Sequence, residues 1–296
     1  KQKTAYEFRL SLVGSEMCIR DSNYVENIFD NPQMHSGLEC LLGVYGYALV
    51  IYCDFSGYSD MAIGMARWMG FTIPPNFDSP YQSSSITEFW RRWHISLSSW
   101  LKDYLYISLG GNKKGKIRLY INLMITMLLG GLWHGASWNF IIWGGLHGAA
   151  LSLDKFVSSK FRVSGSEFRV SSSELEHKTR NPKLKTGLLR TAGVLFTFHF
   201  VCFCWIFFKA STLSDSLIII KQIAYNFDFS GWEKLVIAYK SVLLVILLGY
   251  VLHFIPQKFE LKTEWLFSKI TFAGRVAVLI FIIWVVIQVK SAEQVM

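Results

Sequence analysis

Long uncharged hydrophobic runs recur along this 296-residue chain and alternate with short polar segments. The longest run, residues 119–153, contains no Asp, Glu, Lys or Arg, whereas one membrane-spanning helix needs only about 20 apolar residues. Shorter runs of the same kind occupy residues 40–53, 191–208, 241–255 and 276–289. The pattern predicts an all-α, polytopic membrane protein.

The first predicted helix has a polar interruption. Its apolar positions run over residues 37–53 and resume over 61–69, and the stretch between them, 54–60, reads DFSGYSD. Two carboxylates around Gly-Tyr in an apolar context predict a broken helix that lines a polar cavity, because irregular backbone is tolerated at membrane depth only there. A helix end at the membrane interface is an equally good interpretation.

A second helix is expected after the proline-rich turn PPNFDSP, residues 74–80, because proline disfavours helix at and before its own position. Ser85 and Glu88 match the S-x-x-E capping pattern just ahead of an apolar run. On the helix that this cap opens, side chains at three- and four-residue steps are expected to share one face: Trp90, His94, Leu97 and Leu101. The segment is too polar to span, so we expect it to lie at the membrane interface or to re-enter partway.

The uncharged run 119–153 predicts two helices joined by a short break. The first covers about 117–133, the residues HGAS at 134–137 interrupt it, and the second starts at Trp138. Glycine and alanine are dense here, which permits close approach of the two helices. His134 is therefore expected at a break between tightly packed helices.

Three further spans are predicted near residues 188–208, 238–255 and 272–290. Before them lies the one long hydrophilic insert, at about 158–190, which is rich in Ser, Lys and Arg. We expect this insert to be a flexible cytoplasmic loop.

The N-terminal residues 1–22 differ from the rest of the chain, with neither an apolar period nor a usable span. Their segment SLVGSEMCIRDS resembles a translated library adapter. Residues 1–22 are therefore predicted to be non-native, and 23–296 to be part of a membrane domain. A native but irregular N-terminus is the alternative.

Composition agrees with a membrane protein, since 52% of the residues are hydrophobic and 17% are charged, against about 25% charged in soluble domains. The net charge of +9 comes from basic residues in loops between apolar runs. That is their usual place on the cytoplasmic side of a membrane, and it argues against a nucleic-acid partner. The five cysteines, an odd number without metal-like spacing, are expected to be small core residues.

Two histidines in apolar segments, His94 and His134, are the candidate catalytic pair, because titratable groups at membrane depth are costly without a functional reason. Motifs typical of serine hydrolases, zinc proteases and nucleotide-binding proteins are absent from the sequence. A neutral imidazole suits general-base catalysis, so His134 could take the proton from a hydroxyl that attacks an acyl group. His94 could then bind the acyl carbonyl or orient the acceptor. Two purely structural histidines are the alternative.

A metal site would need a third ligand, and His147 is available thirteen residues after His134. No Asp or Glu pattern completes such a site, so no metal is predicted. His199 and His253 lack polar neighbours at helical spacing, and we expect them to be core histidines.

Four motifs occur in order along the chain: YCDFSGYSDMAIGMARWMGF, PPNFDSPY, SITEFWRRWHISLSSWLKDYLYISLGGN and LLGGLWHGASWNFIIWGGLHG. Together they resemble the membrane-bound O-acyltransferase (MBOAT) family, most closely its bacterial branch that O-acetylates alginate and other exopolysaccharides. The resemblance starts at about Asn23 and implies a helical ring around a membrane-crossing tunnel, without the family's early helices. It also implies that His134 in LWHG is the catalytic histidine and that His94 in RRWHISLS is the second active-site position.

This resemblance implies a multi-pass protein of the bacterial inner membrane that transfers an acetyl group towards hydroxyls of an exported, alginate-like polysaccharide. The donor would be acetyl-coenzyme A or another acyl thioester, with no bound cofactor, and a periplasmic acetyltransferase is the expected partner protein. Arg91 and Arg92 are candidates for binding the phosphates of coenzyme A, with interfacial anchoring as their alternative role. All candidate substrate-binding residues are Arg91, Arg92, Trp93, Trp133, Asp54 and Tyr58.

Two other functions remain alternatives. One is a polysaccharide transporter or flippase, which would predict inverted repeats that the sequence does not display. The other is a non-catalytic membrane scaffold for a periplasmic transferase.

Overall fold

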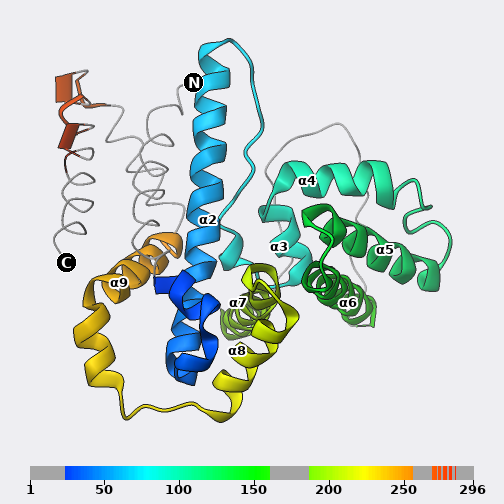
Figure 1. Ribbon diagram of the computed structural model, residues 1–296. Coiled ribbons are helices and arrows are strands. Elements are labelled where there is room, and N and C mark those ends of the chain that lie inside the picture. The colour runs from blue at the N-terminus through cyan, green and yellow to red at the C-terminus, as the bar shows by residue number, and fades with distance from the viewer. Residues whose placement is uncertain are drawn as a thin grey trace. The chain divides into compact units, whose positions relative to one another are not determined.

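The computed structural model describes residues 24–160 and 187–255, together with 269–271, 273, 274, 276–278, 280, 281 and 284. Every regular element in this part of the chain is a helix, so the all-α prediction is confirmed (Figure 1). The chain forms two compact units. The terminal unit comprises Lys1–Ser79 and Trp205–Met296, and the central unit comprises Pro80–Cys204.

The terminal unit is built on α2, which packs against α8 and α9. Its elements are η1 (Pro32–Met34), α2 (Gly37–Trp68), the end of α7 (Gly187–Lys209), α8 (Leu213–Tyr225) and α9 (Trp232–His253). The central unit is built on a pair of packed helices, α5 and α6. Its elements are η2 (Pro80–Gln82), α3 (Ile86–Arg92), α4 (Ile95–Trp100), the π-helical η3 (Leu101–Tyr106), α5 (Lys116–His134), α6 (Trp138–Lys160) and most of α7.

Helix α2 runs without a break for 32 residues, about 48 Å at 1.5 Å per residue (Figure 1). The predicted interruption at 54–60 is therefore wrong. A glycine inside a helix costs only about 1 kcal/mol relative to alanine, and Gly57 and Ser59 are buried in the packed helix. The Ser56 hydroxyl bonds back to the Cys53 carbonyl at 3.4 Å, so it remains compatible with the helical backbone.

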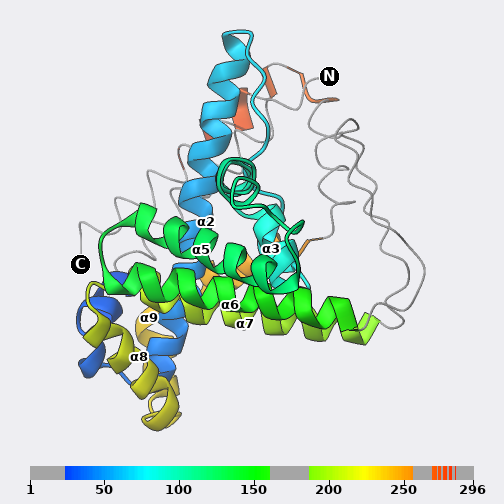
Figure 2. The same cartoon turned by 90° about the vertical axis from the view of Figure 1, so that its right-hand side faces the viewer.

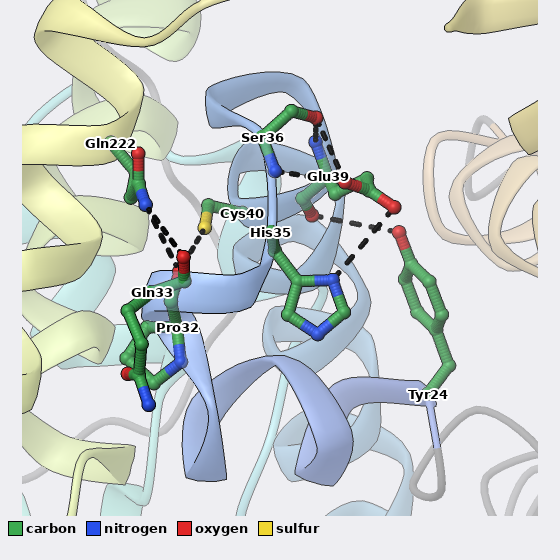
Figure 3. A network of polar contacts seen from close by, with 8 residues as sticks. All are labelled: Tyr24, Pro32, Gln33, His35, Ser36, Glu39, Cys40 and Gln222. Atoms are coloured by element: carbon green, nitrogen blue, oxygen red, sulfur yellow. Dashed lines mark hydrogen bonds and ion pairs between the residues drawn. The ribbon is translucent and has the colours of Figure 1, made fainter.

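A reciprocal cap starts α2 (Figure 3). The Ser36 hydroxyl accepts from the Glu39 backbone N–H at 3.3 Å, while the Glu39 carboxylate accepts from the Ser36 N–H at 2.8 Å. Tyr24 and His35 also contact Glu39, at 3.5 Å and 3.8 Å. Gln222 of α8 donates to the η1 carbonyls and joins α8 to this end of α2. This cap has the same S-x-x-E signature that predicts the helix start at Ser85, and the sequence analysis overlooked it.

The hairpin of α5 and α6 confirms the two predicted helices and the break at 134–137 (Figure 2). Glycines make the close approach possible. A Cβ added to Gly131 would overlap the Phe140 carbonyl oxygen, and one added to Gly144 would overlap the Met127 carbonyl oxygen.

Among the described residues, three helices are long and apolar enough to cross a membrane: α2, α7 and α9. The predicted spans near 188–208 and 238–255 coincide with α7 and α9. Helices α5 and α6 are not among these three, and both contain glycine, asparagine, tryptophan and histidine. The predicted span at 272–290 and the insert at 158–190 lie largely outside the described residues, as does the whole of 1–22.

The remaining core predictions have mixed outcomes. His253 is buried, with its ring 4.7 Å from that of Tyr52, so it is a core histidine. His199 is exposed on α7, and the core prediction for it is wrong; its Nδ1 lies 2.7 Å from the Leu195 carbonyl oxygen. Three cysteines are buried free thiols, as predicted: Cys40, Cys202 and Cys204. Cys53 is only partly buried, and Cys18 lies outside the described residues.

Adjacent glycines on α6 provide a matched test of the hairpin. Gly144→Ala should lower stability by about 1–3 kcal/mol, because its Cβ would meet the backbone of α5. Gly145→Ala should be neutral or stabilising by up to about 1 kcal/mol, because its Cβ would have only an ordinary 3.7 Å contact with Leu128. Thermal unfolding of the detergent-solubilised protein measures both, and equal melting temperatures for the two variants would contradict the packing.

Candidate active site

The helix that leads to His94 is fixed at its N-terminus. The Ser85 hydroxyl caps α3 by accepting from the Glu88 N–H at 3.2 Å, as predicted. The Glu88 carboxylate instead accepts from the Ser84 backbone N–H and hydroxyl, at 2.8 and 2.9 Å, and pairs with Arg92 at 2.8 Å. Asp154 of α6 accepts from the Thr87 N–H at 3.0 Å and ties the start of α3 to α6.

His94 itself ends the helical path. Its backbone is left-handed (φ 44°, ψ 57°), so α3 stops at Arg92 and α4 starts at Ile95. The prediction of one helix with Trp90, His94, Leu97 and Leu101 on a shared face is wrong for this reason. Histidine adopts this region more readily than bulky or β-branched residues do, but such a conformation still costs on the order of 1–3 kcal/mol.

Contacts on both sides hold the His94 turn. The His94 carbonyl accepts from the Ser98 N–H at 2.9 Å and begins α4, while the Ser98 hydroxyl donates to the Trp93 carbonyl at 3.2 Å. Trp93 is only 4% exposed and stacks on Phe89 with centroids 5.6 Å apart. On the imidazole, Nδ1 lies 3.4 Å from the Ser96 hydroxyl.

His134 is the last residue of α5, at the predicted break. Its ring is surrounded by aromatic rings, with centroids 4.9 Å from Trp133, 5.4 Å from Trp143 and 6.0 Å from Phe140. Gly135 follows, and a Cβ there would come within 2.8 Å of the Phe140 ring. The chain can therefore turn tightly against α6 immediately after the histidine.

The central unit brings His94 and His134 together, although forty residues separate them in sequence. Burial and, to a smaller extent, the nearby His134 imidazole lower the pKa of His94 to about 4. Burial also lowers the pKa of His134. Both rings are therefore neutral near pH 7, which is the state that a general base requires.

The central unit contains a third histidine, His147. His147 of α6 is fully buried, and its Nδ1 accepts from the Trp90 indole N–H at 3.2 Å. The Trp143 ring contacts both histidines of the α5–α6 hairpin, with centroids 5.4 Å from His134 and 4.9 Å from His147. The sequence analysis did not single out Trp143, although its spacing of four residues from His147 places both on one face of α6.

The predicted substrate-binding residues fall into different places. Trp133 is 65% exposed and lies beside His134. Arg91 is exposed, Arg92 is paired with Glu88, and Trp93 is buried in the central unit. Asp54 and Tyr58 are exposed one turn apart on α2. They belong to the terminal unit, whereas the two histidines belong to the central unit. Substrate binding by all six stays a prediction.

Across the described ranges, no group of three or more His, Cys, Asp or Glu side chains is placed to hold a metal ion. His147 has its Nδ1 engaged by Trp90.

Fold and site together define a helical membrane protein with two neutral histidines next to helix ends. The model of the membrane-bound O-acyltransferase family (MBOAT) matches residues 5–171, which is more than half of the chain. The chain belongs to this family. The match includes part of residues 1–22, whose predicted non-native origin stays a prediction.

Several relatives of known name match between about half and two thirds of the chain. The chain is 45% identical over 191 residues to a probable alginate O-acetylase AlgI of Azotobacter vinelandii, covering 64% of the chain and 33% of the relative. It is 41% identical over 193 residues to a peptidoglycan O-acetyltransferase of Helicobacter pylori, covering 65% and 33%. A teichoic acid D-alanyltransferase of Bacillus subtilis is 31% identical over 176 residues, covering 57% and 40%. The chain thus spans about a third of the length of the first two relatives.

The proximity of the two histidines can be tested by titration. NMR of isotope-labelled histidine, assigned with His94→Gln, should give a His94 midpoint near 4. In His134→Gln the midpoint should rise, because a second imidazole no longer opposes protonation, yet stay below 6.5 because burial persists. An unchanged midpoint in His134→Gln would show that the two rings do not interact.

Proposed function

We propose that this protein is a membrane O-acyltransferase that transfers an acetyl group from a cytosolic thioester towards hydroxyls of an exported polysaccharide. The observation that carries the proposal is the pair of neutral histidines, His94 and His134, in a chain of the MBOAT family. The names of the relatives support acyl transfer to cell-surface polymers, namely alginate, peptidoglycan and teichoic acid.

In the proposed reaction, His134 is the general base. The acceptor hydroxyl oxygen attacks the thioester carbonyl carbon while its proton passes to the neutral His134 imidazole. The tetrahedral intermediate then collapses, the C–S bond breaks, and the leaving thiolate takes the proton from the imidazolium. This sequence returns His134 to its neutral form with no change in redox state.

His94 supports the developing negative charge. If the Ser96 hydroxyl donates to Nδ1, at 3.4 Å, the hydrogen of the neutral ring resides on Nε2. That N–H can donate to the acyl carbonyl oxygen as it becomes an oxyanion, the type of interaction that stabilises acyl-transfer transition states. A left-handed backbone takes His94 out of the regular helix, and its imidazole is close enough to His134 for the two to interact electrostatically.

The same proposal specifies the acyl donor, the acceptor, the membrane and the partner protein. Acetyl-coenzyme A or another acyl thioester is the donor, and an alginate-like polysaccharide is the acceptor. Arg91, which is exposed at the end of α3, would bind the phosphates of the donor in this proposal. We place the protein in the bacterial inner membrane as a multi-pass protein, working with a periplasmic acetyltransferase that completes the transfer.

A radiolabel assay tests the proposal. Protein reconstituted in liposomes and supplied with labelled acetyl-coenzyme A should release or transfer label, and His134→Ala should reduce the rate at least 100-fold, since general-base catalysis contributes typically 10²–10⁴-fold. His199→Ala, an exposed histidine on α7, is the control and should keep the wild-type rate. Equal rates for His134→Ala and wild type would refute the mechanism, and polysaccharide transport without label transfer would favour a flippase.

A further inference from the structure

His147 is a polar group with no exposed surface inside an aromatic cluster. Its ring is 5.2 Å from Trp90, 4.9 Å from Trp143, 6.2 Å from Phe89 and 5.8 Å from Phe200, measured between centroids. These neighbours come from α3, α6 and α7 of the central unit. A phenylalanine of similar shape would satisfy the packing, so the cluster by itself does not explain an imidazole.

The hydrogen bond from Trp90 determines the tautomer of His147. An indole N–H only donates, so Nδ1 must accept and the hydrogen of the neutral ring must be on Nε2. Nε2 is buried and has no hydrogen-bond partner among the described residues. An unsatisfied buried donor opposes stability. The imidazole is therefore retained despite a cost, which points to a role for its directional bond at Nδ1.

His147 connects the two segments that carry the catalytic candidates. Trp90 of α3 is four residues before His94 in the sequence, and its hydrogen bond to His147 joins α3 to α6. On its other side, His147 contacts Trp143, whose edge packs against the His134 ring at 5.4 Å. His147 thus contacts both Trp90, on the helix that leads to His94, and Trp143, whose ring contacts His134.

We propose that His147 is a positioning residue: its hydrogen bond to Trp90 and its ring contact with Trp143 set the separation and orientation of His94 and His134. This inference rests on the proposed function. A misplacement of about 1 Å in a catalytic group can cost about 100-fold in rate, so a small loss of orientation has a measurable effect.

Three substitutions separate the directional bond from packing. The Asn oxygen occupies nearly the place of Nδ1, the Gln amide lies nearer the place of Nε2, and Phe keeps only the ring. We expect His147→Phe and His147→Gln to lower kcat about 10- to 100-fold with little change in the KM for acetyl-coenzyme A. His147→Asn should recover at least a tenth of the wild-type kcat. His199→Phe, the same change at an exposed site, is the matched control.

A double-mutant comparison tests the partner. Trp90→Phe removes the indole donor and keeps an aromatic ring, so it should reproduce the loss seen in His147→Phe. The double variant should lose no more than either single variant, because both remove one interaction. Multiplied losses in the double variant would overturn the proposal.

A readout without catalysis distinguishes this inference from the proposed function. In His147→Phe, the NMR titration midpoint of His94 should move towards 6.5, because the two imidazoles separate. An unchanged midpoint, or wild-type kcat in His147→Phe, would overturn the positioning role. A melting temperature reduced equally in all three His147 variants, with equal losses of kcat, would overturn it as well. Wild-type protein without His134-dependent transfer would refute the proposed function alone, and the His94 midpoint would then decide the positioning role.

Discussion

Desolvation of imidazole is the constraint on which the central unit depends. A buried histidine is favoured in its neutral form, which has one donor nitrogen and one acceptor nitrogen. Aromatic rings lie against His134 and His147. The polar contacts at Nδ1 of His94 and of His147 indicate which ring nitrogen carries the hydrogen. In such a site, the side chains packed around an imidazole determine which of its two nitrogens carries the hydrogen.

Both candidate catalytic side chains lie at helix ends. Inside a regular helix a side chain is committed to the face that its position dictates, whereas a residue at an end can point away from it. His94 leaves the helical path through a left-handed backbone, and His134 is followed by a glycine turn. The cost of these irregular turns is offset by the packing of Phe89 and Trp93 and by the close glycine contacts between α5 and α6.

The names of the relatives concern the acyl group that is transferred, whereas the structure concerns the residues that could carry out the transfer. The relatives include named acetyl- and D-alanyltransferases, which differ in the acyl group that their names specify. A base and an oxyanion donor are needed for transfer of either acyl group to a hydroxyl. The histidine pair is thus suited to the step that such reactions share, and it lies wholly within the central unit.

The sequence alone determined the helical class, the break at 134–137 and the cap at Ser85, because uncharged runs and short capping signatures are local. It also singled out His94 and His134, because a titratable residue among apolar ones is visible without coordinates. Only the tertiary structure decided that α2 continues through 54–60 and that His94 ends a helix. The same holds for the bond between His147 and Trp90, 57 residues apart. Hydrophobic periodicity cannot distinguish these outcomes, since the contacts that offset an irregular turn or orient a buried ring come from residues distant in sequence.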